Sequence, residues 1–234
     1  MTVALPAYIS VVFLITVFVT AGLFIHLVRK AGDDKPAVRV LTYLIPLWMI
    51  LHGFNALAGS YAPDPASIPL MMLTGPLPAL LFLGTFFLLF REKVVANLPI
   101  KLLTIIHIVR VPVEFVLHSL YENGAVPAVM TYSGANFDIL SGITAPIVYY
   151  FAFRNGQANR ILLGVWNILA LGLVITIVTI AVLSFPAPLQ QLAFDQPNLA
   201  VAYFPYVWLP TVIVPIVLFC HASSLYKIWA NKLN

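Results

Sequence analysis

Seven apolar segments constrain this chain more than any other feature of its sequence. A transmembrane helix needs about 20 mainly apolar residues to cross the hydrocarbon layer of a bilayer. The segments cover about 6–28, 36–59, 68–90, 98–121, 137–153, 161–183 and 204–229. Hydrophobic residues make up 62% of the 234 positions and charged residues only 9%, against about 25% charged in an average soluble domain. The sequence therefore predicts an all-α, polytopic integral membrane protein, a seven-transmembrane-helix bundle forming a single domain over residues 1–234.

The distribution of charge predicts the orientation of this bundle. Short cytoplasmic loops are enriched in lysine and arginine. With the N-terminus outside and the C-terminus cytoplasmic, every lysine and arginine except Arg110 falls on the cytoplasmic side, and the outer loops hold only Asp64, Glu122 and Asp195 as charged residues. Six or eight helices would break this segregation. We therefore expect a multi-pass protein of a prokaryotic-type inner or plasma membrane.

Composition also bears on partners. The net charge of +4 comes from cations in small clusters between apolar segments, without the basic face typical of nucleic-acid binding. We therefore expect membrane lipid and no nucleic acid as partners, and the sequence identifies no protein partner. Cys220 is the only cysteine, which excludes an intrachain disulfide and a cysteine-based metal framework.

One polar stripe lies inside the apolar segment 98–121. On a helix turning about 100° per residue, His107, Arg110, Glu114 and His118 fall within an arc of roughly 80°. A charged side chain in hydrocarbon costs at least about 2.5 to 3.5 kcal/mol on insertion scales, so Arg110 and Glu114 must face protein, water or a ligand. The stripe therefore predicts an interior polar site.

The predicted orientation gives each polar residue a depth. Arg110 lies near the midplane. The outer half would hold a set consisting of His52, Asn55, Glu114, His118, Asn136 and Asp138. A second, inner level would pair His107 with His221. Tyr132, in the loop that precedes the segment 137–153, would border the access to the outer pocket.

Three interpretations of the outer set stay open. In the first, His52, His118 and Glu114, with Asp138, bind a divalent metal such as zinc or iron, because three or four nitrogen and oxygen ligands suit these ions. In the second, Arg110 and Glu114, four residues apart, neutralise each other in a structural ion-pair network. In the third, the histidines and carboxylates form a proton or polar-ligand pathway.

Cofactors other than a metal ion can be weighed in the same way. Haem ligation by His52 with His118, or by His107 with His221, is a less favoured variant of the metal hypothesis. The seven-helix arrangement is similar to that of microbial rhodopsins, whose retinal is held by a lysine in the middle of the last helix. The only lysine of the segment 204–229 is Lys227, at its cytoplasmic end, so we do not expect retinal.

In topology and residue types, the chain also resembles the seven-helix zinc hydrolases that include alkaline ceramidases and adiponectin receptors. Their last helix carries two histidines four residues apart, whereas the segment 204–229 holds only His221. No residue role is therefore transferred from that family.

Three functional hypotheses follow. The first is a pocket that binds a metal ion, cofactor or small polar ligand, in a protein that could be a metal-dependent membrane enzyme with Glu114 or Asp138 as acid or base. The second is a proton-coupled transporter that uses Arg110 and Glu114. The third is a non-catalytic sensor or membrane-complex subunit with a structural ion-pair network, for which the outer segment 185–203 would be a partner surface.

Overall fold

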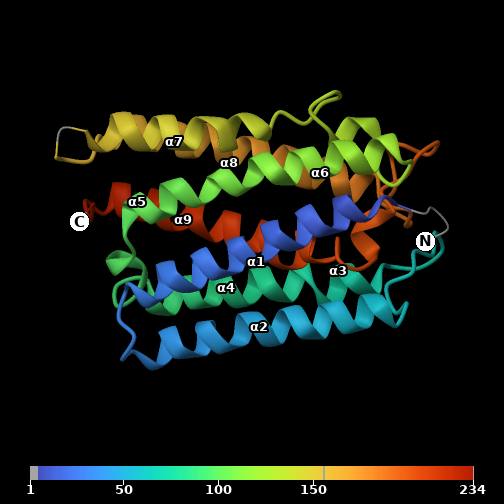
Figure 1. The fold of residues 1–234 in the computed structure, drawn as a ribbon. Coiled ribbons are helices and arrows are strands. Elements are labelled where there is room, and N and C mark those ends of the chain that lie inside the picture. Colours follow the sequence, from blue (N-terminus) through green and yellow to red (C-terminus); the bar gives the residue numbers. More distant parts are fainter. Residues whose placement is uncertain (1–4, 155, 234) are drawn as a thin grey trace.

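The computed structural model describes residues 5–154 and 156–233, and within these residues the chain is helical and contains no strand. In this described part, five helical stretches are long and apolar enough to cross a membrane. They are α1 (Ala7–Arg29), α2 (Pro36–Leu57), α3 with α4 (Leu70–Phe90), α8 (Arg160–Leu183), and η5 with α9 (Leu209–Trp229). The apolar helix α7 (Ile139–Phe153) is shorter. The helices run side by side along one direction, as in a membrane protein (Figure 1).

The segment that carries the polar stripe is helical throughout, in three consecutive pieces. They are α5 (Ile100–Ile105), the 3₁₀ turn η2 (Ile106–Val109) and α6 (Arg110–Glu122). Pro112 has no backbone N–H, so it cannot donate an α-helical hydrogen bond to the carbonyl of Ile108, four residues earlier. The 3₁₀ turn lies at this position. The helix expected over about 98–121 is therefore present, with an interruption in its middle.

Two other helix interruptions contact each other. α3 (Leu70–Thr74) ends and α4 (Pro76–Phe90) begins at Gly75. A Cβ atom at Gly75 would lie 2.6 Å from Cγ2 of Thr211 and 2.7 Å from the carbonyl oxygen of Met71, so glycine allows this close approach. Thr211 belongs to η5 (Leu209–Ile213), a π-helical turn that contains Pro210 and leads into α9 (Val214–Trp229). π-Helical turns are frequent at functional sites.

The connection between α8 and η5 covers other loops of the same chain. The carbonyl oxygen of Ala125 accepts hydrogen bonds from the N–H groups of Leu199 and Ala200, at 3.1 and 3.0 Å. Nε2 of Gln196 donates to the carbonyl oxygen of Val126 at 2.6 Å. The three remaining short helices are η1 (Val95–Asn97), η3 (Ala128–Met130) and η4 (Ala200–Ala202). Much of the expected partner surface 185–203 thus packs on its own protein.

Large apolar side chains cover the outside of the bundle. On α2, Tyr43 is 75% exposed and Phe54 is 71% exposed. α2 packs on α1 and η5 and lies at one edge of the molecule (Figure 1). Extensive exposed apolar surface is typical of a face that contacts a partner or lipid. The charged residues Arg110 and Glu114 are buried instead.

Candidate functional site

The candidate site is built where α6 and α7 meet. Arg110 is the first residue of α6 and is 2% exposed, and Glu114, one turn later, is 1% exposed. Asp138 directly precedes α7 and is also buried. A Cβ atom at Gly142 of α7 would lie 2.8 Å from Cγ2 and 2.9 Å from the backbone nitrogen of Val111. This glycine therefore allows α7 to approach α6 closely enough to bring the charged groups together.

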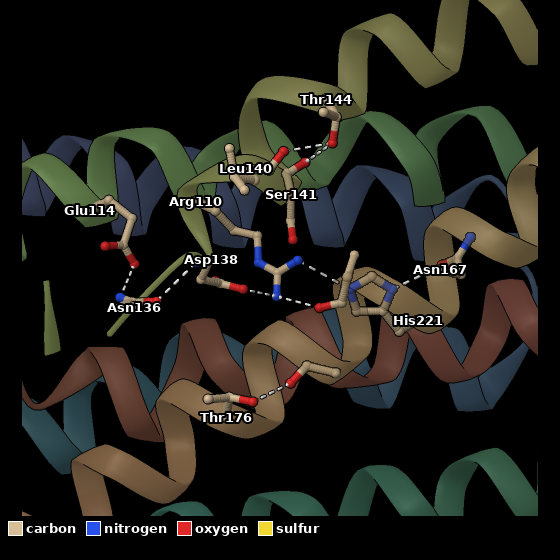
Figure 2. Close-up of polar contacts among 12 residues, drawn as sticks. Arg110, Glu114, Asn136, Asp138, Leu140, Ser141, Thr144, Asn167, Thr176 and His221 are labelled. Atoms are coloured by element: carbon tan, nitrogen blue, oxygen red, sulfur yellow. Dashed lines mark hydrogen bonds and ion pairs between the residues drawn. The ribbon is translucent and has the colours of Figure 1, made fainter. Parts of the chain in front are cut away.

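Asp138 is the ionic partner of Arg110. Nη2 of Arg110 lies 2.6 Å from Oδ1 of Asp138 (Figure 2). The interpretation that paired Arg110 with Glu114 is thereby corrected. The two side chains leave the helix in different directions: that of Arg110 extends toward His221, and that of Glu114 toward Asn136 (Figure 2).

Asn136 connects the two carboxylates. Its Nδ2 donates to Oε1 of Glu114 at 2.6 Å and to the carbonyl oxygen of Met130 at 3.0 Å. Its Oδ1 accepts a hydrogen bond from the N–H of Asp138 at 3.0 Å. Within the described chain, Oε2 of Glu114 is buried and has no hydrogen-bond partner. A buried acceptor without a partner costs about 1 to 3 kcal/mol, so this oxygen is well placed to contact a bound molecule.

Arg110 also connects this cluster to α8 and α9. Its Nη1 lies 3.3 Å from Nε2 of His221, and its Nη2 donates to the carbonyl oxygen of Ala170 at 3.2 Å. Because a guanidinium group only donates, Nε2 of His221 is the acceptor, and Nδ1 then donates to Oδ1 of Asn167 at 2.9 Å. The network shown in Figure 2 runs from Glu114 through Asn136, Asp138 and Arg110 to His221 and Asn167.

His107 lies against this network without a hydrogen bond to it. The rings of His107 and His221 stack with their centroids 4.0 Å apart and their planes 24° apart. Both ring nitrogens of His107 are buried without a hydrogen-bond partner in the part of the chain that the structure describes. Two rings in stacking contact leave no space for an iron atom between them. The geometry therefore does not fit the haem ligation expected as a variant for these two residues.

A cavity of about 140 Å³ lies beside the carboxylates. Arg110, Glu114 and Asp138 form one part of its lining, and Asn198 contributes another polar side chain. The other lining residues are apolar and come mainly from α3, α4, α8, η5 and α9. For comparison, an apolar protein cavity of about 150 Å³ can hold benzene. The cavity can therefore hold a small apolar group next to a polar one.

The expected metal ligands are not brought together. Among residues 5–154 and 156–233, no group of three or more His, Cys, Asp or Glu side chains could hold a metal ion. Nδ1 of His52 lies 2.8 Å from Oη of Tyr61, and the ring packs on Trp48. Nδ2 of Asn55 donates to the carbonyl oxygen of Leu51 in its own helix, at 2.8 Å. His52 is fully buried next to Gly75, where α3 meets α4, and Asn55 is half-buried on α2.

His118 belongs to a separate cluster between the C-terminal part of α6 and the loop that precedes α7. Its Nδ1 lies 3.1 Å from Oγ of Ser133, and its Nε2 lies 3.6 Å from Oε1 of Glu122. The ring stacks on Tyr132, with the centroids 4.5 Å apart. His118 and Tyr132, expected at the metal site and at the pocket entrance, thus contact each other.

Two asparagines of the site were not predicted from the sequence. Asn167 is the hydrogen-bond partner of His221, and Asn198 lines the cavity. Asn167 is an isolated amide in the apolar segment 161–183, a signal that could have identified it because polar groups within membrane helices tend to face the protein interior. Asn198 lies in a connection that already contains several polar residues, so no comparable signal distinguishes it.

Comparison with known proteins gives a family without an assigned activity. A family model described as "Domain of unknown function (DUF8737)" matches residues 68–229, more than half of the chain. No curated protein and no solved structure matches the chain. The matched segment contains every residue that lines the cavity beside Glu114.

Proposed function

Because this chain belongs to the DUF8737 family, whose description states no activity, we propose its function from the geometry of the site. The protein binds an amphiphilic small molecule in the cavity beside Glu114. The polar group of this molecule contacts Glu114, and its apolar part lies against the side chains of α4, α8 and α9. The function is therefore that of a ligand-binding membrane protein, such as a sensor or carrier of a lipid-soluble molecule.

The observation that carries this proposal is the position of Oε2 of Glu114. This oxygen is buried, lacks a partner among the described residues, and belongs to a side chain that lines an otherwise largely apolar cavity. A fully polar ligand would leave the apolar lining without contacts, and a fully apolar one would leave the carboxylate oxygen unsatisfied. A molecule with one polar end and one apolar end satisfies both.

We propose further that the chain crosses the membrane seven times, with the N-terminus outside. The interrupted helix Ile100–Glu122 and the helix Ile139–Phe153 would then be crossings in addition to the five longer stretches. The described chain begins and ends at opposite ends of the bundle (Figure 1), as an odd number of crossings requires. The concentration of cations in alternate connections supports the orientation.

The ligand proposal is tested by blocking the cavity. Val178 of α8 lines the cavity, whereas Ile175 of the same helix is 52% exposed and is not a lining residue. We expect the wild-type protein and Ile175→Trp, purified in mild detergent, to carry the same small molecule in native mass spectrometry. Val178→Trp should lose that mass because the indole fills the cavity.

A second readout uses 1-hexanol as a probe of the same space. It should raise the unfolding temperature of the wild-type protein and of Ile175→Trp, because a ligand of the folded state stabilises it. Val178→Trp should show no such increase. The proposal is overturned if no copurified molecule depends on Val178 and 1-hexanol stabilises none of the three proteins.

A further inference from the structure

We infer that the molecule bound beside Glu114 carries a primary ammonium group. This inference rests on the proposed function and names the chemistry of the polar end of the ligand. Its basis is the balance of charge and of hydrogen-bonding groups around the cavity.

The ionisable side chains that line the cavity include more acidic groups than basic ones. Arg110 supplies one positive charge, and Asp138 and Glu114 supply two carboxylates. Arg110 pairs with Asp138 at 2.6 Å, whereas Glu114 receives only the neutral amide of Asn136. A buried charge without a counter-charge is strongly unfavourable, so a cationic ligand group beside Glu114 would stabilise its ionised form over the neutral acid.

The neighbouring histidine does not supply the missing charge. Nε2 of His221 faces the donor Nη1 of Arg110, and its Nδ1 faces Oδ1 of Asn167. With Nε2 as an acceptor, the imidazole carries one proton and is neutral. His221 therefore provides no counter-charge for an ionised Glu114.

The hydrogen-bonding groups that line the cavity favour a ligand group that donates hydrogen bonds over one that accepts them. Oδ1 of Asp138 is ion-paired with Arg110. Two other acceptors on lining residues, Oε2 of Glu114 and Oδ1 of Asn198, lack partners within the described chain. Among the donors on the lining residues, Nε of Arg110 has no hydrogen-bond partner in the part of the chain that the structure describes. An ammonium group offers three donors and no acceptor, a hydroxyl group one donor, and a carboxylate none. The ammonium group thus matches the two free acceptors best.

The apolar part of the cavity sets the size of the group that follows the ammonium. A volume of about 140 Å³ is close to that of an apolar cavity that holds benzene, a six-carbon molecule. The half-buried Val178 and the 39% exposed Leu80 belong to the lining, so a longer chain can leave the cavity between α8 and α4. The ligand class is therefore a single-chain lipophilic amine.

Three probes of equal length test the assignment. Hexylamine, 1-hexanol and hexanoate share a six-carbon chain and differ only in the polar end. Near pH 7.5 an alkylamine is an ammonium ion, because its pKa resembles that of lysine, about 10.4. Affinities are measured by calorimetry on the full chain in nanodiscs of phosphatidylcholine, a zwitterionic lipid without net charge. We expect hexylamine to bind at least about tenfold more tightly than 1-hexanol, because a hydrogen bond to a charged group is stronger than one between neutral groups. Hexanoate should bind most weakly of the three.

Two matched variants on α6 test whether Glu114 causes the preference for hexylamine. Glu114→Gln removes the carboxylate at the cavity, and Glu122→Gln makes the same change at an exposed position of the same helix. Glu114→Gln should lose about tenfold or more in hexylamine affinity and keep its 1-hexanol affinity, which also shows that the variant is folded. Glu122→Gln should bind all three probes as the wild-type protein does.

Each outcome has a distinct meaning. Equal or tighter binding of 1-hexanol or hexanoate overturns the ammonium assignment and leaves the proposed function in place. Hexylamine preference that survives in Glu114→Gln overturns the role of Glu114. Absence of binding by all three probes overturns the proposed function itself. General electrostatic attraction cannot produce the expected order, because the net charge of +4 favours hexanoate.

Discussion

Arg110 is the residue on which the site depends, because it contacts groups from three different elements. It pairs with Asp138 before α7, approaches His221 of α9 and donates to the carbonyl oxygen of Ala170 in α8. All of these contacts are buried. Loss of one partner would leave a charge inside the bundle without compensation, which is costlier than loss of an exposed ion pair.

We predict that Asp138→Ala lowers the free energy of unfolding by about 3 to 5 kcal/mol, the usual cost of removing one partner of a buried ion pair. Asp195→Ala, at an exposed position of the connection between α8 and η5, should change the free energy of unfolding by less than about 0.5 kcal/mol. The measurement is reversible unfolding in mixed detergent micelles. Equal stability of the two variants would show that the pair is not structurally important.

For individual residues, the sequence predicted which charged side chains are buried better than it predicted which groups they contact. The helical spacing of His107, Arg110 and Glu114 showed that they share one face, and burial of the three residues agrees with that stripe. The partner of Arg110 could not be chosen from spacing, because Glu114 is near in sequence and Asp138 is brought near only by helix packing. His52 and His118 are also polar residues of the expected outer level, and each contacts a different partner.

At the scale of the elements, glycines determine which helices can touch. Gly142 faces the backbone of Val111, and a Cβ atom there would lie 2.9 Å from that nitrogen. Gly172 of α8 has no described atom within 4 Å of an added Cβ. Both are glycines within helices, so sequence alone does not distinguish them.

Alanine substitution separates these two glycines. Gly142→Ala should destabilise the protein by about 1 to 3 kcal/mol, because the new methyl group forces α7 away from α6. Gly172→Ala should be neutral or stabilise by up to about 1 kcal/mol, the difference in helix propensity. Unfolding in mixed micelles measures both, and the 1-hexanol response should weaken only in Gly142→Ala. A neutral effect of Gly142→Ala would contradict the close contact between α6 and α7.

For the molecule as a whole, the two ends of the bundle differ in charge. The connections after α1 and α4 contain clustered lysine and arginine, and the connection between α8 and η5 contains Asp195 and no cation. The seven-crossing proposal places these connections on opposite sides of the membrane. It therefore predicts opposite accessibility for residues in them.

Site-directed cysteines test this orientation against a low background, because the native Cys220 is buried. In intact cells, a membrane-impermeant maleimide should label Asp195→Cys. Lys30→Cys should react only after the membrane is opened, since it would face the cytoplasm. The reverse pattern would place the N-terminus inside, and labelling of both from outside would contradict an odd number of crossings between these two positions.

The helical character, the approximate bounds of the helices and the burial of a polar stripe follow from the amino-acid sequence alone. These properties depend on local hydrophobicity and on backbone hydrogen bonds that each helix satisfies internally. Three features follow from helix packing alone: Asp138 pairs with Arg110, His52 contacts Tyr61, and a largely apolar cavity adjoins the carboxylates. Those features depend on close approach at Gly75 and Gly142 and on the π-helical turn in residues 209–213. Such contacts join residues distant in sequence, so no helical period encodes them.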